Sequence, residues 1–238
     1  MTLPPVCILA GGLATRLGDR ARDVPKALIE VAGRPFALHQ LELLAGHGAR
    51  RIVYCVGHLG ERIEQAIGPR ACGLEIAYAY DGDRAAGTAG AVRGALPLLG
   101  DEFLVLYGDT FLRIDYAAVA AARRTGAWTA CMAVLHNADR WGPSNCVFDG
   151  ARVLAHDKRA PTCDMTWIDY GVAALTPQAL DPPGDDLCDV YAALARDGRL
   201  GGYEATERFY EIGTPQRLAE TEAWLLSEDA RRATRPRA

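Results

Sequence analysis

The stretch "VCILAGGLATRLGD", residues 6–19, decides the fold. Its apolar run ends abruptly at Gly11 and Gly12, and Arg16 follows within a few residues. A short apolar run bounded by turn residues predicts a buried strand, here over residues 6–10. Open parallel sheets bind their ligands beyond the carboxyl ends of the strands. The stretch therefore predicts a strand that brings a glycine turn and a cation to a ligand site.

The glycine turn has the composition of a phosphate-binding loop. Glycine allows a close approach of the backbone to a ligand and a positive φ, and successive N–H groups in such a turn form a nest for an anion. Arg16 can add a bidentate contact, and Lys26, which follows Pro25, can supply a second cation. The alternatives are a tight turn with a surface arginine and a solvated lysine.

Strands and helices alternate along the chain from this turn. Nearly continuous apolar strands between helices predict a parallel sheet that is covered on both faces. We therefore predict an α/β fold, a Rossmann-like three-layer sandwich with a mostly parallel mixed sheet. The predicted strands span 6–10, 51–57, 74–80, 103–109 and 128–135, and the predicted helices span 36–48, 60–68, 87–99 and 116–126.

The pattern changes near residue 140, where shorter strands and turns predict antiparallel additions to the same sheet. Thr214 and Pro215 are typical of an N-cap and a first helical residue. No linker or repeat interrupts the chain, so we predict one domain over 1–228 and a basic, disordered tail over 229–238. The predicted strands of this half span 145–149, 152–156, 166–175 and 207–213, and the helices span 185–198 and 214–228.

Composition narrows the functional class. The chain has 238 residues, half of them apolar, and a net charge of −4, which argues against nucleic-acid binding. It shows neither a leader pattern nor an apolar run of membrane-spanning length, so neither secretion nor a membrane partner is expected. Seven cysteines without a CxxC pair predict buried, reduced thiols and a cytoplasmic location.

The segments "LAGGLATRL" (9–17) and "VPKALIEVAGRPF" (24–36) resemble the signature of the sugar-1-phosphate nucleotidyltransferases, also called nucleoside-diphosphate-sugar pyrophosphorylases. Ala14 replaces a glycine of the family pattern, and Ala27 replaces the proline after the lysine. The resemblance continues in order to about residue 226. It implies a nucleotide-binding half over about 1–135 and a smaller sugar-binding lobe over 136–228.

The segment "AAGTAGAV" (85–92) resembles the part of the family that lies against the nucleotide base. Small residues at a helix start leave room for a flat ring, although they are also typical of a packed helix N-terminus. The resemblance implies that Arg16 and Lys26 are catalytic. It implies a nucleotide site formed by Leu9, Ala10, Gly11, Gly12, Arg16, Lys26, Gly87, Thr88 and Ala89.

The segments "VLYGDT" (105–110) and "YEIGTPQRL" (210–218) resemble the two acidic motifs of the family. A carboxylate at the end of a buried strand can hold Mg²⁺ against phosphate oxygens, which makes Asp109 a catalytic and metal-binding candidate. A helix N-cap is the alternative role for Asp109. Glu211 is the second candidate ligand, at a position where most members have aspartate.

The segment "HDKRAP" (156–161) resembles the family motif whose lysine meets the sugar phosphate, a role that falls to Lys158. Two further segments, 141–149 and 167–175, correspond to the sugar pocket, where polar groups in apolar surroundings suit hydroxyl recognition. Each of these residues could instead be structural. The candidates for sugar binding are Gly142, Asn145, Asp157, Lys158, Asp169, Tyr170 and Gly171.

The implied reaction transfers a nucleotidyl group from an NTP to a sugar 1-phosphate, with Mg²⁺, and releases pyrophosphate. The motifs favour GTP with manno-heptose or mannose 1-phosphate. A uridylyltransferase for N-acetylmuramate 1-phosphate, a cytidylyltransferase for a non-sugar phosphate and a non-catalytic binding subunit stay open. The family also suggests a homodimer.

Overall fold

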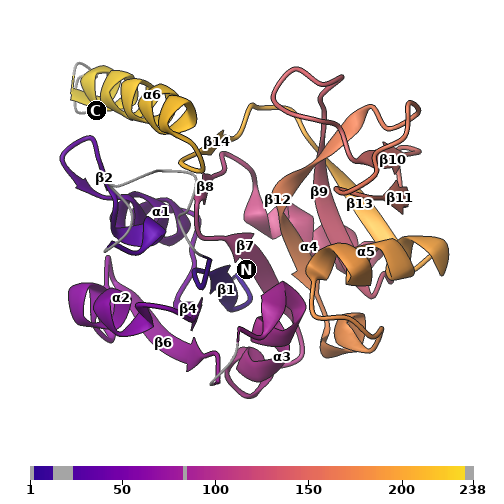
Figure 1. Ribbon diagram of the computed structural model, residues 1–238, viewed down its shortest axis with the longest axis horizontal. Coiled ribbons are helices and arrows are strands. Elements are labelled where there is room, and N and C mark those ends of the chain that lie inside the picture. Colours follow the sequence, from indigo (N-terminus) through magenta and orange to yellow (C-terminus); the bar gives the residue numbers. More distant parts are fainter. Residues whose placement is uncertain (1–2, 13–23, 83–84, 234–238) are drawn as a thin grey trace.

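The computed structural model describes residues 3–12, 24–82 and 85–233, and its centre is a ten-stranded mixed sheet (Figure 1). Eight strands follow one path from edge to edge, and two more, β9 (Ala130–His136) and β13 (Leu200–Ala205), join it through β12. The order along the path is β11 (Val153–His156), β10 (Cys146–Phe148), β12 (Trp167–Leu175), β7 (Phe103–Tyr107), β1 (Val6–Leu9), β4 (Arg51–Val56), β6 (Leu74–Tyr80) and β5 (Arg70–Ala71).

Four neighbouring strands, β7, β1, β4 and β6, are parallel, as the apolar runs predicted. Helices cover both faces, because successive strand residues point to opposite sides. Val6 and Ile8 belong to one hydrophobic core, and Cys7 belongs to the other. The first core is covered by α1 (Phe36–Gly46), α2 (Gly60–Ile67) and α4 (Tyr116–Thr125), and the second by α3 (Gly87–Leu99) and α5 (Leu187–Arg196). The predicted three-layer α/β fold is confirmed (Figure 1).

The second half of the chain adds antiparallel strands to this sheet, as predicted. Strand β12 pairs antiparallel with β7, β9 and β10, and its register with β9 shifts between Asp169 and Ala173. Gly171 lies inside this irregularity at φ +101. The bulge therefore bends β12 beside the end of β7, where the site lies.

Strand β13 was not predicted. Its sequence includes Gly201 and Gly202, and glycine is poor in strands. The structure explains both glycines: a Cβ on Gly201 would lie 2.2 Å from the Trp128 ring, and one on Gly202 would lie 2.3 Å from the Phe148 ring. The two rings cover the strand in place of side chains of its own.

The predicted strand 207–213 is mostly irregular. Its only extended part, β14 (Tyr210–Glu211), pairs antiparallel with β8 (Thr110–Phe111) outside the main sheet. A small hairpin and two 3₁₀ turns were also not predicted. They are β2 (Glu30–Val31) with β3 (Arg34–Pro35), η2 (Lys26–Leu28) and η3 (Pro177–Leu180).

The closing helix, α6 (Pro215–Ala233), is longer than predicted. Thr214 caps it as expected, since its hydroxyl accepts the Arg217 N–H at 3.2 Å. Residues 229–233 continue the helix, so the prediction of a disordered tail from 229 is wrong for them, and 234–238 lie outside the described residues. No helix in the described part is long and apolar enough to cross a membrane.

The cysteines follow the prediction only in part. All seven thiols are free, and five are buried. Cys72 and Cys163 are exposed, because each lies in a loop between strands rather than in an apolar run. The expectation of a fully buried set is therefore wrong for these two.

Candidate functional site

A cavity of about 410 Å³ opens beyond the carboxyl ends of the parallel strands. Its lining includes most of the nucleotide-site residues that the sequence predicted. Arg16 lies outside the described residues, and Ala89 is fully buried behind the cavity in α3. The predicted residues that line it are Leu9, Ala10, Gly11, Gly12, Lys26, Gly87, Thr88 and Asp109.

The glycine turn is explained by close approach rather than by backbone angle. Neither Gly11 nor Gly12 has a positive φ, which corrects that part of the expectation. A Cβ on Gly11 would lie 3.2 Å from the backbone nitrogen of Gly57, so a larger residue would push β1 and the end of β4 apart. A Cβ on Gly12, which lines the cavity, would meet nothing within 4 Å among the residues that the structure describes.

The start of α3 is held by the chain itself. Gly87 has φ +70, and a Cβ there would lie 2.3 Å from the carbonyl oxygen of Asp185. The Ala89 N–H donates to that carbonyl at 2.8 Å. The Thr88 hydroxyl donates to Asp186 Oδ1 at 3.0 Å and accepts the Leu187 N–H at 2.7 Å. The small residues at the start of α3 therefore leave space for the 185–187 segment. Hydrogen bonds to this segment hold the start of α3 against the start of α5.

Asp109 and Lys26 meet at the wall of the cavity, where Lys26 Nζ lies 3.0 Å from Asp109 Oδ2. Asp109 follows β7 in a turn that needs Gly108, since a Cβ there would lie 2.7 Å from the Leu9 carbonyl oxygen. The buried Gln40 amide donates to the carbonyls of Tyr107 and Thr110, one on each side of the turn. The turn is thus fixed from two directions, and its carboxylate faces the ligand space.

Glu211 comes to Asp109 through the small β8–β14 pair. It lies opposite Thr110, and the Ile212 N–H donates to the Asp109 carbonyl at 3.0 Å. The space beside Gly213 is shared: a Cβ on that glycine would lie 3.0 Å from Glu211 Oε2 and 3.8 Å from Asp109 Oδ2. The structure therefore brings together both carboxylates that the sequence predicted as metal ligands.

These two carboxylates fit a magnesium ion. Mg²⁺ prefers hard oxygen ligands and is commonly held by one or two carboxylates together with waters and substrate phosphates. Among the described residues no group of three or more His, Cys, Asp or Glu side chains is arranged to hold a metal. Two carboxylates would supply part of the coordination sphere of Mg²⁺, and waters and substrate phosphates would supply the rest.

Lys158, from the second half of the chain, contacts a residue of the cavity lining. Its Nζ lies 2.6 Å from Asp169 Oδ2 and 3.3 Å from the hydroxyl of Tyr107, which lines the cavity. Burial alone would lower the pKa of Lys158, but the Asp169 carboxylate and the Tyr107 hydroxyl hold it above its ordinary value. Burial alone would raise the pKa of Asp169, and Lys158 holds it below its ordinary value. Both groups are therefore charged at neutral pH.

Several predicted sugar-pocket residues position this ion pair. The Asn145 Oδ1 accepts the Asp169 N–H at 2.9 Å, and Asp169 Oδ1 accepts the Gly171 N–H at 2.9 Å. Asp157, which precedes the lysine, accepts the N–H groups of Arg159 and Ala160. These bonds shape the two segments that carry Lys158 and Asp169.

The remaining two candidates lie away from the ion pair. Tyr170 follows Asp169 on β12 and points to the opposite face, where it is 1% exposed and donates to the Arg113 carbonyl at 3.4 Å. Gly142 has φ +140 and lines a separate hollow with Ser144 and Cys163. None of the seven sugar-binding candidates is among the residues that line the cavity at the strand ends, and these two also lie apart from the Lys158–Asp169 pair.

We expect Asp169→Asn to lower the free energy of unfolding at pH 7 by about 2 kcal/mol, since it leaves the Lys158 charge without its partner. The figure is toward the low end because the lysine side chain is 36% exposed. A carboxylate with a lowered pKa stabilises the fold above its unfolded-state pKa and loses that effect as the pH falls. Urea unfolding at pH 7 and pH 3 should show a larger difference in unfolding free energy at pH 7 than at pH 3, and an equal difference at both would contradict the prediction.

Among the cavity residues that sequence reasoning missed, Asp81 and Tyr107 carry oxygen groups that can bind a ligand. Asp81 follows β6, and its Oδ2 lies 3.0 Å from the point that a Cβ on Gly57 would take. A polar residue directly after an apolar strand was the available signal. Tyr107 ends β7, and burial raises its pKa to about 12 against the opposing effect of Lys158, so its hydroxyl is neutral at pH 7.

These features define a class of protein. The chain is an α/β protein whose ligand cavity lies at the carboxyl ends of parallel strands, with glycines, a lysine and carboxylates at its wall. The chain belongs to the MobA-like NTP transferase domain family, whose model matches residues 6–233.

Curated relatives differ in the base they transfer and in length. The chain is 31% identical over 225 residues to the N-acetylmuramate alpha-1-phosphate uridylyltransferase of Neisseria meningitidis, and this match covers 91% of the chain and 96% of the relative. It is 30% identical over 140 residues to the D-glycero-alpha-D-manno-heptose 1-phosphate guanylyltransferase of Campylobacter jejuni, covering 58% of the chain and 61% of that protein. A third match, to the CMP-5'-(3-aminopropyl)phosphonate synthase of Streptomyces rubellomurinus, is 38% identical over 103 residues, which are 43% of the chain and 16% of that protein.

Solved structures share the fold. The structure of HddC from Yersinia pseudotuberculosis complexed with GMP-PN superposes with a TM-score of 0.76 and 21% identity, covering 94% of this chain and 100% of that one. At this identity the likeness concerns the fold alone.

Proposed function

We propose that the protein transfers a nucleotidyl group from an NTP to a sugar 1-phosphate and releases pyrophosphate. The observation that carries this proposal is that two lysines from different halves of the chain contact residues at the end of β7 that line one cavity. Lys26 lies beside Asp109, and Lys158 contacts Tyr107, a residue of the same cavity lining. Two separate cations suit a reaction between two phosphate-bearing substrates that repel each other.

In this reaction an oxygen of the sugar phosphate attacks the α-phosphorus of the NTP, and the bond from that phosphorus to the β-phosphate oxygen breaks. Lys158 holds the attacking phosphate, and Lys26 faces the α-phosphate, where negative charge develops. The glycine turn, with Arg16, holds the β- and γ-phosphates. Asp109 and Glu211 would hold Mg²⁺, which neutralises charge on the phosphates when it is bound.

The cavity has room for the nucleotide to lie across the strand ends. Strands β7 and β6 are separated by β1 and β4, so their ends are about 14 Å apart at ordinary strand spacing. Asp109 follows β7, and Asp81 follows β6. With the phosphates at Lys26 and Asp109, the base lies toward Asp81. A carboxylate only accepts hydrogen bonds, and guanine offers it two adjacent donors, N1–H and the N2 amino group. GTP is therefore the favoured donor.

We expect Asp81→Asn to lower kcat/KM for GTP by about 10- to 100-fold, the loss typical of one bidentate base contact. The other nucleotides should change much less, because they lack that pair of donors. Pyrophosphate release with each of the four NTPs measures the effect, and the exposed Asp101→Asn is a matched control. A uniform loss with all four nucleotides would count against base recognition by Asp81.

The acceptor is proposed as manno-heptose or mannose 1-phosphate. The test is pyrophosphate release for four NTPs against mannose, heptose, glucose and N-acetylmuramate 1-phosphates with Mg²⁺. Activity with GTP and a manno-configured sugar supports the proposal. If no substrate pair gave pyrophosphate but calorimetry still showed NTP binding, the proposal would be wrong. The acceptor would then be a non-sugar phosphate, or the protein would bind nucleotide without catalysis.

Uridylyl transfer to N-acetylmuramate 1-phosphate is the second candidate. It is favoured by the relative that matches over nearly its whole length, which bears that name. The same set of substrates separates the two, since this candidate requires UTP with N-acetylmuramate 1-phosphate. Cytidylyl transfer to a non-sugar phosphate is the third, and the phosphonate synthase match supports it over a shorter stretch.

A further inference from the structure

Arg217 connects the acidic pair to the loop of the second half. It lies in the first turn of α6, and its Nε is 3.5 Å from Glu211 Oε1. Its Nη2 donates to the backbone carbonyl of Trp141. One guanidinium therefore contacts a candidate metal ligand and the segment that the sequence assigned to the sugar side.

The two oxygens of the Glu211 carboxylate face different groups. Oε1 faces Arg217, while Oε2 lies 3.0 Å from the Cβ point of Gly213, on the side of Asp109. Helix α6 also holds the backbone here, because the buried Thr221 hydroxyl donates to the Glu211 carbonyl at 2.6 Å. Glutamate has one more rotatable bond than aspartate, so a second contact is needed to fix its carboxylate. The Arg217 contact to Oε1 leaves Oε2 directed at the shared space.

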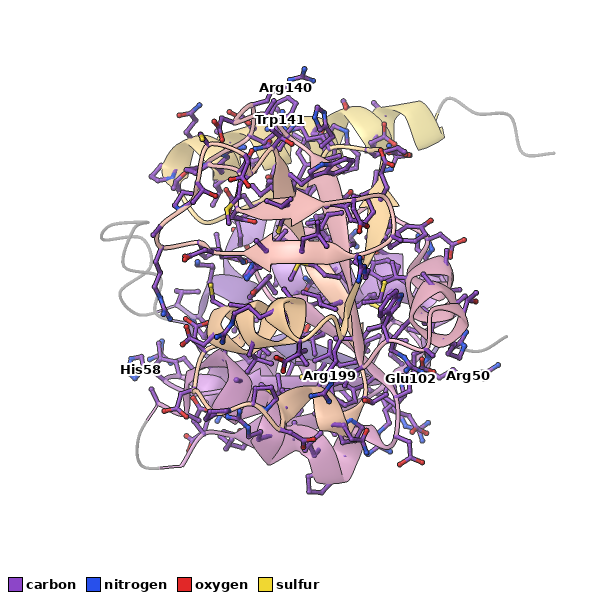
Figure 2. The ribbon with its side chains drawn as sticks, turned by 90° about the vertical axis from the view of Figure 1, so that its right-hand side faces the viewer. Arg50, His58, Glu102, Arg140, Trp141 and Arg199 are labelled. Atoms are coloured by element: carbon purple, nitrogen blue, oxygen red, sulfur yellow. The ribbon has the colours of Figure 1, made fainter. Side chains whose placement is uncertain are left out.

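The loop that Arg217 contacts is held by side-chain hydrogen bonds. The side chain of Asn137, which is 2% exposed, accepts the Trp141 N–H at 2.9 Å and donates to the Gly142 carbonyl at 2.7 Å. The Trp141 ring lies under the Arg208 guanidinium at 4.1 Å. Figure 2 shows Trp141 at one end of the molecule, in the same region as α6. A shift of this loop would therefore move the carbonyl that Arg217 holds.

We propose that Arg217 is a positioning residue, which orients Glu211 toward the divalent cation and fixes the 137–145 loop relative to it. The inference rests on the proposed function, because it concerns the cation of that reaction. Arginine suits the role, since its planar fork donates in two fixed directions at once. Lysine has a single ammonium group and can hold either the carboxylate or the carbonyl well.

The test measures GTP binding by calorimetry with and without Mg²⁺, for the wild type, Arg217→Gln and Arg217→Lys. Loss of an outer contact to a metal ligand typically costs about 10- to 100-fold in metal affinity. We expect Arg217→Gln to reduce the Mg²⁺-dependent gain in GTP affinity by about tenfold and to leave binding without Mg²⁺ unchanged. Arg217→Lys should restore part of the gain. Arg124→Gln, which removes the ion pair between Arg124 on α4 and Glu102, is the matched control.

Steady-state kinetics and thermal melting complete the test. Arg217→Gln should raise the Mg²⁺ concentration for half-maximal rate and the KM for the sugar phosphate, with a melting temperature close to that of Arg124→Gln. A wild-type Mg²⁺-dependent gain in the glutamine variant would overturn the proposal. So would a glutamine variant whose only defect is a lower melting temperature. If the wild type binds GTP with Mg²⁺ but transfers the guanylyl group to no sugar phosphate, the proposed function fails. The calorimetric comparison still decides the role of Arg217 in that case.

Discussion

Replacing Lys26 by methionine is expected to lower kcat by about a thousandfold while the protein stays folded. Methionine keeps the length of the side chain and removes the charge that faces the α-phosphate. Removal of one group that stabilises developing charge typically costs 10²- to 10³-fold in kcat, or about 4 kcal/mol at the upper end. The measurement is steady-state pyrophosphate release with saturating substrates.

The stability of the fold should change little in Lys26→Met. Lys26 and Asp109 side chains are 22% and 27% exposed, so their ion pair is partly solvated. Such pairs contribute up to about 1 kcal/mol, which corresponds to a shift of about 2–4 °C in melting temperature for a chain of this size. Wild-type turnover in Lys26→Met would remove Lys26 from the mechanism. A large fall in melting temperature would instead assign the ion pair a structural role.

The first half of the fold follows from local pattern. Strand β1 and its neighbours are continuous apolar runs that end at glycine or an acidic residue, and helices at 36–46 and 87–99 separate them. Such runs are buried on both faces, so hydrophobicity alone marks their length. Thr214 and Pro215 marked the start of α6 for a local reason, the cap itself.

The elements that escaped prediction depend on distant partners. Strand β13 has two glycines because Trp128 and Phe148 fill the space of their side chains. Strand β14 is only two residues long and exists through its pairing with β8, a hundred residues earlier. No window of sequence contains either partner, so neither element has a local signature.

The candidate site also contains residues with a local sequence signal and residues that depend on distant partners. Lys26 and Asp109 could be proposed from their motifs, and the structure brings them to 3.0 Å. Asp81 and Tyr107 reach the cavity through the order of the strands, and Arg217 reaches Glu211 beside the β8–β14 pair. Tyr170 was proposed from its motif, whereas its place directly after Asp169 on β12 directs its side chain to the core.

Asp109→Asn is expected to lower kcat by at least a hundredfold through a different step from Lys26→Met. The amide keeps the size of the side chain but removes the charge that a magnesium ion requires of its ligand. The Mg²⁺-dependent gain in GTP affinity should therefore disappear in Asp109→Asn and persist in Lys26→Met. Calorimetric titration of GTP into each variant, with and without Mg²⁺, separates the two.

The double variant Lys26→Met/Asp109→Asn tests whether the two side chains have separate roles in the reaction. The two side chains are in direct contact, so their effects on stability should not add. If Lys26 stabilises the phosphate and Asp109 holds the cation, each single variant loses a different contribution and the double variant is slower than either one. If Lys26 serves only to orient Asp109, the double variant is no slower than Asp109→Asn alone. If the second result came together with a normal Mg²⁺ response in Asp109→Asn, Asp109 would be only the ion-pair partner of Lys26. The cation would then bind elsewhere.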